Sequence, residues 1–176
     1  MQRQHKKLIV PRSNLFFDQE KNMKFLMLDE LKAMPIWIPY RQTYSGKQPS
    51  RYGYAPSRWK EPGKLTNYGG AVARINEANG RLAGVGVVVP IGFTVLDLDK
   101  CDAGPNNPVV KLFSSYTELS PSGKGLHIII KCAEAGPKFD CIIEGMSVEF
   151  KTPGNFVTVT EKQYLLNIRL IYWSWE

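Results

Sequence analysis

The sequence predicts an α+β fold in which an antiparallel or mixed β-sheet carries helices on one of its faces. Two patterns support this: helical spacing of apolar residues in the first half, and short β-branched runs bounded by turn residues after Gly80. Hydrophobic residues make up 43% and charged residues 22% of the 176-residue chain, which is typical of one globular domain. That domain is expected to span residues 23–176, because residues 1–22 are polar and irregular and predict an N-terminal extension.

A helix is predicted from Met23, and Pro35 ends it. Its apolar residues recur at three-residue spacing, at Phe25, Leu28, Leu31 and Met34. A strand begins at residues 36–38, and Pro39 is expected to keep it short or at a sheet edge, because proline lacks a backbone N–H.

Residues 42–66 predict a long loop, followed by a helix that Asn67 caps and that runs to about Asn79. Residues 1–80 contain 14 Lys and Arg against 6 Asp and Glu, whereas residues 81–176 contain 9 against 10. Cations that track phosphates and aromatic rings that stack bases are typical of a surface for single strands. The predicted nucleic-acid-binding residues in and beside this loop are Arg41, Lys47, Arg51, Arg58, Trp59, Lys60 and Lys64. Packing of the tyrosine-rich loop on its own domain is the alternative.

Three hairpins are predicted after Gly80, each made of two β-rich runs around a turn rich in Gly, Pro or Ser. Their strands are residues 85–89 with 93–99, residues 116–119 with 126–131, and residues 147–151 with 155–160. A short helix is expected at residues 108–114.

Alternation along these strands places ionisable residues on one face and apolar residues on the other. Asp97 and Asp99 lie two residues apart, His127 lies on the polar face of a second strand, and Glu149 and Lys151 lie on that of a third. If the three strands share a sheet, these side chains converge on one open acidic surface. The helices are expected to cover the other face.

Three clustered carboxylates, Asp97, Asp99 and Glu149, repel one another unless a cation neutralises them. Carboxylate oxygens suit Mg²⁺ or Mn²⁺, which also bind phosphate oxygens, and two such ions can activate a hydroxyl and stabilise departing pyrophosphate. We therefore predict a two-ion site with these three residues as catalytic metal ligands. Taken singly, each acid has a structural alternative as a solvated strand residue.

Donors for a triphosphate follow the same pattern. His127 and the turn Ser122-Gly123-Lys124-Gly125 offer an imidazole, backbone N–H groups and an ammonium. The alternatives are an ordinary hairpin turn, since the spacing is not that of a P-loop, and a structural histidine beside an isoleucine run.

Three segments together resemble the prim-pol branch of the archaeo-eukaryotic primase superfamily, found in phages and plasmids. They are GVGVVVPIGFTVLDLD at 84–99, YTELSPSGKGLHIIIK at 116–131 and VEFKTPGNFVTVT at 148–160. Asp97 and Asp99 match the family's DxD, Ser120, Ser122 and His127 fall in its SPSGxGxH motif, and Glu149 matches its strand acid. The resemblance covers about residues 24–160, but Asn155 stands where a basic residue is frequent in the family.

The resemblance implies a template-dependent nucleotidyltransferase, a primase or DNA polymerase that adds dNTPs or NTPs on a primed single-stranded DNA template. It also implies an RRM-like catalytic subdomain at residues 84–162 joined to an N-terminal α/β unit at residues 23–83. The acids would bind Mg²⁺ or Mn²⁺, and a replicative helicase is a possible partner. The residues implied to bind the nucleotide are Ser120, Ser122, Gly123, Lys124, Gly125, His127 and Lys151.

Other classes of protein are weighed against this interpretation. A catalytically inactive RRM-like module that binds single strands would be expected to show aromatic residues on its central strands rather than acids. A rolling-circle endonuclease uses an HxH pair, whereas His5 and His127 are the only histidines of the chain. Three cysteines without a CxxC pair, and the absence of a long apolar run or signal-peptide core, favour a cytoplasmic protein that does not bind a membrane.

Overall fold

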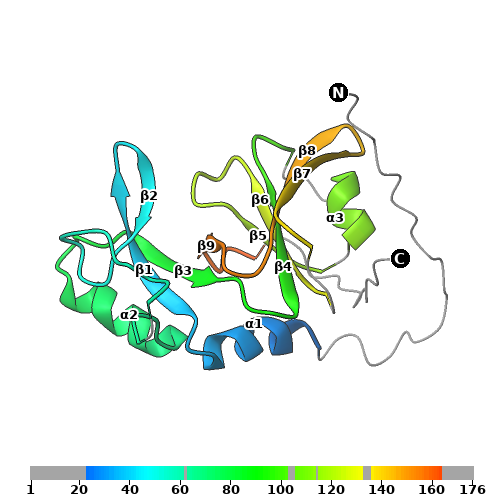
Figure 1. Ribbon diagram of the computed structural model, residues 1–176. Helices are drawn as coiled ribbons and strands as arrows, with labels where there is room; N and C mark the ends of the chain where they lie inside the picture. The colour runs from blue at the N-terminus through cyan, green and yellow to red at the C-terminus, as the bar shows by residue number, and fades with distance from the viewer. Residues whose placement is uncertain (1–22, 62, 103–105, 114, 133–135, 164–176) are drawn as a thin grey trace.

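The computed structural model describes residues 23–163 apart from residues 62, 103–105, 114 and 133–135. It contains two antiparallel sheets and three short helices, so the broad α+β class is confirmed (Figure 1). The four-stranded sheet has the order β2 (Gly46–Pro49), β1 (Trp37–Thr43), β3 (Gly84–Val88) and β9 (Phe156–Val159). The five-stranded sheet has the order β5 (Tyr116–Leu119), β6 (Leu126–Lys131), β4 (Phe93–Leu98), β8 (Met146–Lys151) and β7 (Phe139–Ile143). The predicted extension of residues 1–22 lies outside the described residues.

All three predicted helices form, as α1 (Met23–Ala33), α2 (Tyr68–Glu77) and α3 (Pro108–Phe113). Asn67 caps α2 as predicted, because its side chain accepts a hydrogen bond from the backbone N–H of Gly70 at 2.9 Å. The prediction of an uninterrupted loop over residues 42–66 is wrong at its start, where β2 pairs with β1 in a hairpin. In the part of the chain that the structure describes, no helix has the length and apolar character needed to cross a membrane.

The expectation that Pro39 keeps β1 short or at an edge is also wrong. β1 has seven residues and lies between β2 and β3. The carbonyl oxygen of Pro39 accepts a hydrogen bond from the backbone N–H of Ser50 at 2.9 Å, just beyond the end of β2. The proline nitrogen therefore faces the side where the β2 ladder has ended, and its missing N–H removes no bond between β1 and β3.

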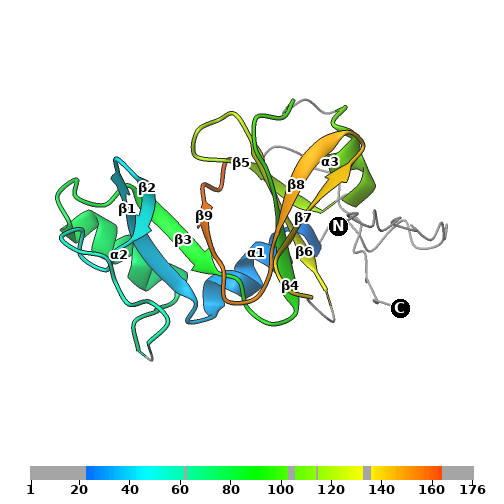
Figure 2. The same ribbon diagram turned by 45° about the horizontal axis from the view of Figure 1, so that its top comes forward.

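Two of the three predicted hairpins are instead crossovers between the sheets. β3 and β4 do not pair with each other, nor do β8 and β9, because β3 and β9 belong to one sheet and β4 and β8 to the other (Figure 2). The two crossovers hold each other in place: Gly154 N–H donates to the carbonyl of Val89, and Val89 N–H donates to that of Asn155, both at 2.9 Å. Residues 84–162, predicted to form one catalytic subdomain, therefore contribute strands to both sheets.

The hairpin of β5 and β6 forms as predicted. The strand β7 was not predicted from the sequence. It pairs with β8 through a tight turn at Glu144 and Gly145, with φ of 49° and 77°. Positive φ at both central positions is typical of a two-residue hairpin turn.

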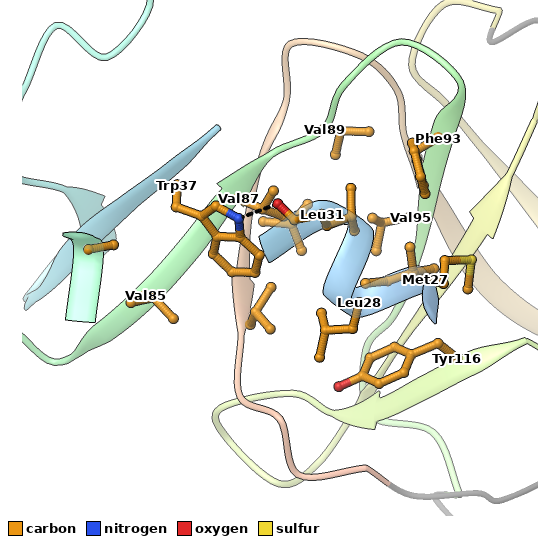
Figure 3. Close-up of a cluster of buried hydrophobic side chains, with 14 residues drawn as sticks. Met27, Leu28, Leu31, Trp37, Val85, Val87, Val89, Phe93, Val95 and Tyr116 are labelled. Carbon is orange, nitrogen blue, oxygen red and sulfur yellow. Dashed lines mark hydrogen bonds between the residues drawn. The ribbon is translucent and has the colours of Figure 1, made fainter. Parts of the chain in front are cut away.

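A first hydrophobic core lies between the two sheets and under α1 (Figure 3). Trp37 is its largest fully buried side chain, and its indole N–H donates to the carbonyl of Leu31 at 2.6 Å. Val95 and Ile129 bring the five-stranded sheet into this core through the same face that carries Asp97.

A second core lies on the opposite face of the five-stranded sheet. Val110 and Phe113 of α3 pack there against Leu96, Ile128 and Phe150. The predicted arrangement of helices on one face and an open acidic face on the other therefore needs correction. The charged face also carries apolar residues, which α1 and the four-stranded sheet cover, and only its remaining part is accessible.

Candidate nucleotide and metal site

A row of five ionisable side chains crosses the charged face of the five-stranded sheet. Each lies directly opposite the next in the strand register, so all five project to the same face. From β5 to β7 the row consists of Glu118, His127, Asp97, Glu149 and Asp140. Strand pairing alone therefore places three of the predicted site residues side by side.

His127 is buried, with 4% of its surface exposed, and bridges two carboxylates of the row. Its Nδ1 lies 3.3 Å from Oε1 of Glu118, and its Nε2 lies 3.6 Å from Oδ1 of Asp97. The imidazole ring therefore has Glu118 as its partner on the buried side and Asp97 as its partner on the accessible side.

Glu149 is held by two ammonium groups. Lys138 contacts one carboxylate oxygen and Lys151 the other, and Nζ of Lys151 also lies 3.6 Å from Oδ2 of Asp97. Partial burial works to raise the pKa of Glu149, but the hydrogen bonds and charges of the two lysines outweigh it and lower that pKa. The Glu149 carboxylate is therefore neutralised by the protein itself.

The turn between β5 and β6 approaches the end of β4 closely. A Cβ atom at Gly125 would stand 2.4 Å from the carbonyl oxygen of Leu98, so only glycine fits there. Ser120 Oγ lies 3.0 Å from Ser122 Oγ, and Gly123 has φ of +70° at the tip. This packing fixes the two serine hydroxyls beside the end of the strand that carries Asp97.

These elements surround a pocket of about 200 Å³ between the two sheets. From the five-stranded sheet and its turn it is lined by Asp97, Asp99, Ser120, Ser122, His127 and Lys151. From the four-stranded sheet it is lined by Lys47, Phe156, Val157 and Thr158. One wall is thus charged and hydroxyl-rich, while the other combines an ammonium group with an aromatic ring.

The structure places the other predicted residues differently. Gly123 and Lys124 are exposed at the tip of the turn, and Gly125 is buried beneath it. Lys47, predicted to bind nucleic acid, lies on β2 and reaches the pocket. Glu149 stands opposite Asp97 in the register but is not among the residues that line the pocket.

The fit of the site to a divalent cation is incomplete. Asp97 and Asp99 both line the pocket, and their oxygens are the ligands that hard cations prefer. Glu149 is engaged by Lys138 and Lys151 instead, and the described residues include no group of three or more His, Cys, Asp and Glu side chains arranged to hold a metal. A metal bound by all three acids would require Glu149 to leave its lysines.

The basic loop carries its cations in three different settings. Arg41 is tied to the loop, because its guanidinium donates to Gln48 Oε1 and to the carbonyl of Tyr54 at 2.6–2.9 Å. Arg58 and Lys64 pair with Glu61, and both pairs are largely solvent-exposed. Two remaining cations lie over aromatic rings: Arg51 over Tyr52, and Lys60 over Trp59.

Exposed aromatic rings accompany these cations. Tyr44, Tyr52 and Tyr54 are 109%, 55% and 70% exposed, so the rings do not pack into the domain core. Arg81, which follows α2, lies over the Tyr54 ring at 4.4 Å. Large exposed rings beside cations offer a surface for stacking.

Glu118 was not predicted from the sequence to belong to the site. A single acid on a strand is ordinarily read as solvated, yet this side chain is completely buried. The signal available was alternation: Glu118 lies on the same face of its strand as Tyr116, and that face proves to be the one that carries His127. Comparison of the chain with protein-family models and with curated proteins found no match.

Proposed function

We propose that the chain is the catalytic domain of a template-dependent nucleotidyltransferase, a primase or DNA polymerase of the prim-pol type. It would add dNTPs or NTPs to a strand on a single-stranded DNA template with the help of two Mg²⁺ or Mn²⁺ ions. The observation that carries the proposal is that Asp97 and Asp99 line one pocket together with Ser120, Ser122 and His127. Residues from two of the three motifs that carry the family resemblance, the DxD and the SPSGxGxH motif, therefore line the same pocket.

The order of strands supports the RRM-like part of the proposal. In the β-α-β-β-α-β fold the first strand lies between the third and the fourth, and the second flanks the third. β4, β5, β6 and β8 occupy these first, second, third and fourth places, and α3 lies between β4 and β5 as the first helix does. β7 occupies the stretch of chain where the second helix would stand.

The two walls of the pocket suit the two parts of a nucleotide. The triphosphate would lie on the wall of His127, Lys151 and the two serines, with Lys47 opposite, because cations and hydroxyl donors bind phosphate oxygens. The ring of Phe156 offers an apolar surface to the sugar or base, and it is fixed in place against Gly86, where a Cβ atom would stand 2.4 Å from it. Asp97 and Asp99, together with Glu149 once it leaves Lys138 and Lys151, would hold the metal ions, which would supply charge neutralisation and activation of the 3′-hydroxyl.

A second candidate is a catalytically inactive single-strand-binding module, and the two lysines on Glu149 favour it. In such a module Lys138 and Lys151 would neutralise the acids permanently, with no need for a cation. A primed single-stranded template with dNTPs or NTPs and Mg²⁺ or Mn²⁺ separates the two. We expect extension that depends on the metal; strand binding without any incorporation under either metal would favour the inactive module.

The template is proposed to run over the basic loop. Replacing Arg58 and Lys60 with Ala is expected to weaken single-stranded DNA binding and to lower the salt slope of log K by about 1.4, since each lost phosphate contact contributes about 0.7 on a single strand. Fluorescence anisotropy at several salt concentrations measures both quantities. The matched control replaces two exposed lysines outside the basic loop, Lys111 in α3 and Lys162 after β9. Equal effects of the two double variants would show that net charge, not this loop, determines binding.

A further inference from the structure

The Glu118 carboxylate lies completely buried in the middle of the molecule, 0% exposed, at the inner end of the charged row. Burying a carboxylate is costly unless hydrogen bonds replace the water it loses. Here they do. Oε1 accepts the backbone N–H of Thr160 at 3.0 Å and Oε2 that of Glu161 at 3.0 Å.

Two side chains complete the environment of this carboxylate. Oε2 accepts the hydroxyl of Tyr116 at 3.1 Å, and Oε1 lies 3.3 Å from Nδ1 of His127. Burial, together with the charge of Glu118, raises the pKa of Tyr116, so its hydroxyl remains a donor. Three of the four neighbours thus donate a hydrogen bond to this carboxylate.

Because a carboxylate only accepts hydrogen bonds, the contact with His127 places a proton on Nδ1. Nε2 then faces the pocket, where it lies 3.6 Å from Oδ1 of Asp97. With Nδ1–H held by Glu118, Nε2 can donate to a phosphate oxygen when the ring carries its second proton. Glu118, which does not line the pocket, therefore determines the orientation of the ring from the buried side.

We propose that Glu118 is a positioning residue, whose buried carboxylate holds the His127 ring by Nδ1–H and turns Nε2 toward the pocket. Its action on a triphosphate, through His127, rests on the function proposed above. The same carboxylate also fastens residues 160–161, which follow β9, to β5. A residue with that fastening role alone would have no effect on the ring's protonation, and this difference makes the proposal testable.

The first test is independent of any activity. The chain has two histidines, so ¹⁵N-histidine labelling of a His5→Gln variant leaves His127 as the only labelled ring. Near neutral pH we expect the ring nitrogens to show a protonated Nδ1. In Glu118→Gln the amide can donate as well as accept, and we expect this preference to be lost. A wild-type protein in which only Nε2 is protonated would overturn the proposal, even if Glu118→Gln failed to fold.

Tyr116→Phe is the matched control. It removes one donor from Glu118 Oε2 without touching Oε1 or the imidazole. We expect lower thermal stability and an unchanged Nδ1-protonated ring. Should Tyr116→Phe shift the tautomer as much as Glu118→Gln does, general loosening of the core would explain the result and positioning would be refuted.

The second test uses nucleotide incorporation. Glu118→Gln is expected to raise KM for the nucleotide about tenfold, with a smaller change in kcat. Removal of the partner that orients a metal-ligating histidine costs about 10–100-fold in affinity or activity, and we expect an effect at the low end of that range. In the His127→Ala background the same substitution should change KM little, because the residue acts through the ring. Fully additive effects would refute positioning. A chain with no incorporation at all would refute the proposed function, while the ring nitrogens would still decide the role of Glu118.

Discussion

Replacement of Asp97 by Asn is expected to reduce metal-dependent nucleotide incorporation by about a hundredfold or more. Asp97 is the one acid that lines the pocket and also faces both His127 and Lys151, so it stands where a cation and a triphosphate would meet. Changes behind a metal ligand cost about 10–100-fold, and loss of a ligand itself should cost at least as much. Steady-state extension of a primed template, together with Mn²⁺ titration, measures the two losses.

Asp140→Asn is the matched control for this variant. Asp140 ends the same row on β7, is exposed, and lies outside the pocket. Its replacement removes the same charge from the same face, so incorporation should stay near the wild-type rate. Normal incorporation by folded Asp97→Asn would remove Asp97 from the catalytic site, and an equal loss in both variants would point to the overall charge of the face.

Trp37→Ala is expected to have the largest effect on stability. The side chain is fully buried between the sheets, and its indole N–H satisfies the carbonyl of Leu31. Truncation of a buried Trp costs about 3–5 kcal/mol, and the unpaired carbonyl adds about 1–3 kcal/mol. Such a loss is comparable with the whole stability of many domains, about 5–15 kcal/mol. Chemical denaturation followed by circular dichroism measures it.

Trp37→Phe keeps most of the apolar volume and should retain a folded protein of lower stability. Trp59→Ala serves as the control for the loss of a tryptophan, because Trp59 lies in the basic loop against Lys60 rather than in the core. Its effect on the unfolding free energy should stay below about 1 kcal/mol, as for most surface positions. A similar loss in Trp37→Ala and Trp59→Ala would contradict the assignment of Trp37 to the core.

The sequence predicts individual elements of this fold better than their pairing. The strand predicted at residues 93–99 forms as β4 over Phe93–Leu98, with Asp99 in the turn that follows it. The turn predicted before it also forms, yet β3 and β4 lie in different sheets. A turn that contains Pro and Gly changes the direction of the chain locally. Its composition does not indicate with which other strand the strand after the turn pairs. The long-range pairing of β3 with β9 decides this, and it has no local signal.

The same limit applies to the candidate site. Alternation was enough to group Asp97, His127 and Glu149 on one face, because register preserves the two-residue period. The contact of Lys138 with Glu149 depends on the hairpin of β7 and β8, which was not predicted. The hydrogen bonds of Glu118 depend on Thr160 and Glu161, which lie 42 and 43 residues further along the chain. The roles of these residues in metal and nucleotide binding stay predictions.

The pairing of β3 with β9 has a consequence for the way this protein is made. Val85 and Val159 are partners in one sheet although they lie in opposite halves of the chain. During synthesis on the ribosome, β3 has no β9 strand to pair with until nearly all of the domain has emerged. The five-stranded sheet can therefore form before the four-stranded sheet is complete. Folds with such long-range strand pairs form slowly, in about milliseconds to seconds. Until β9 pairs with β3, another chain could pair with the exposed edge of β3 instead.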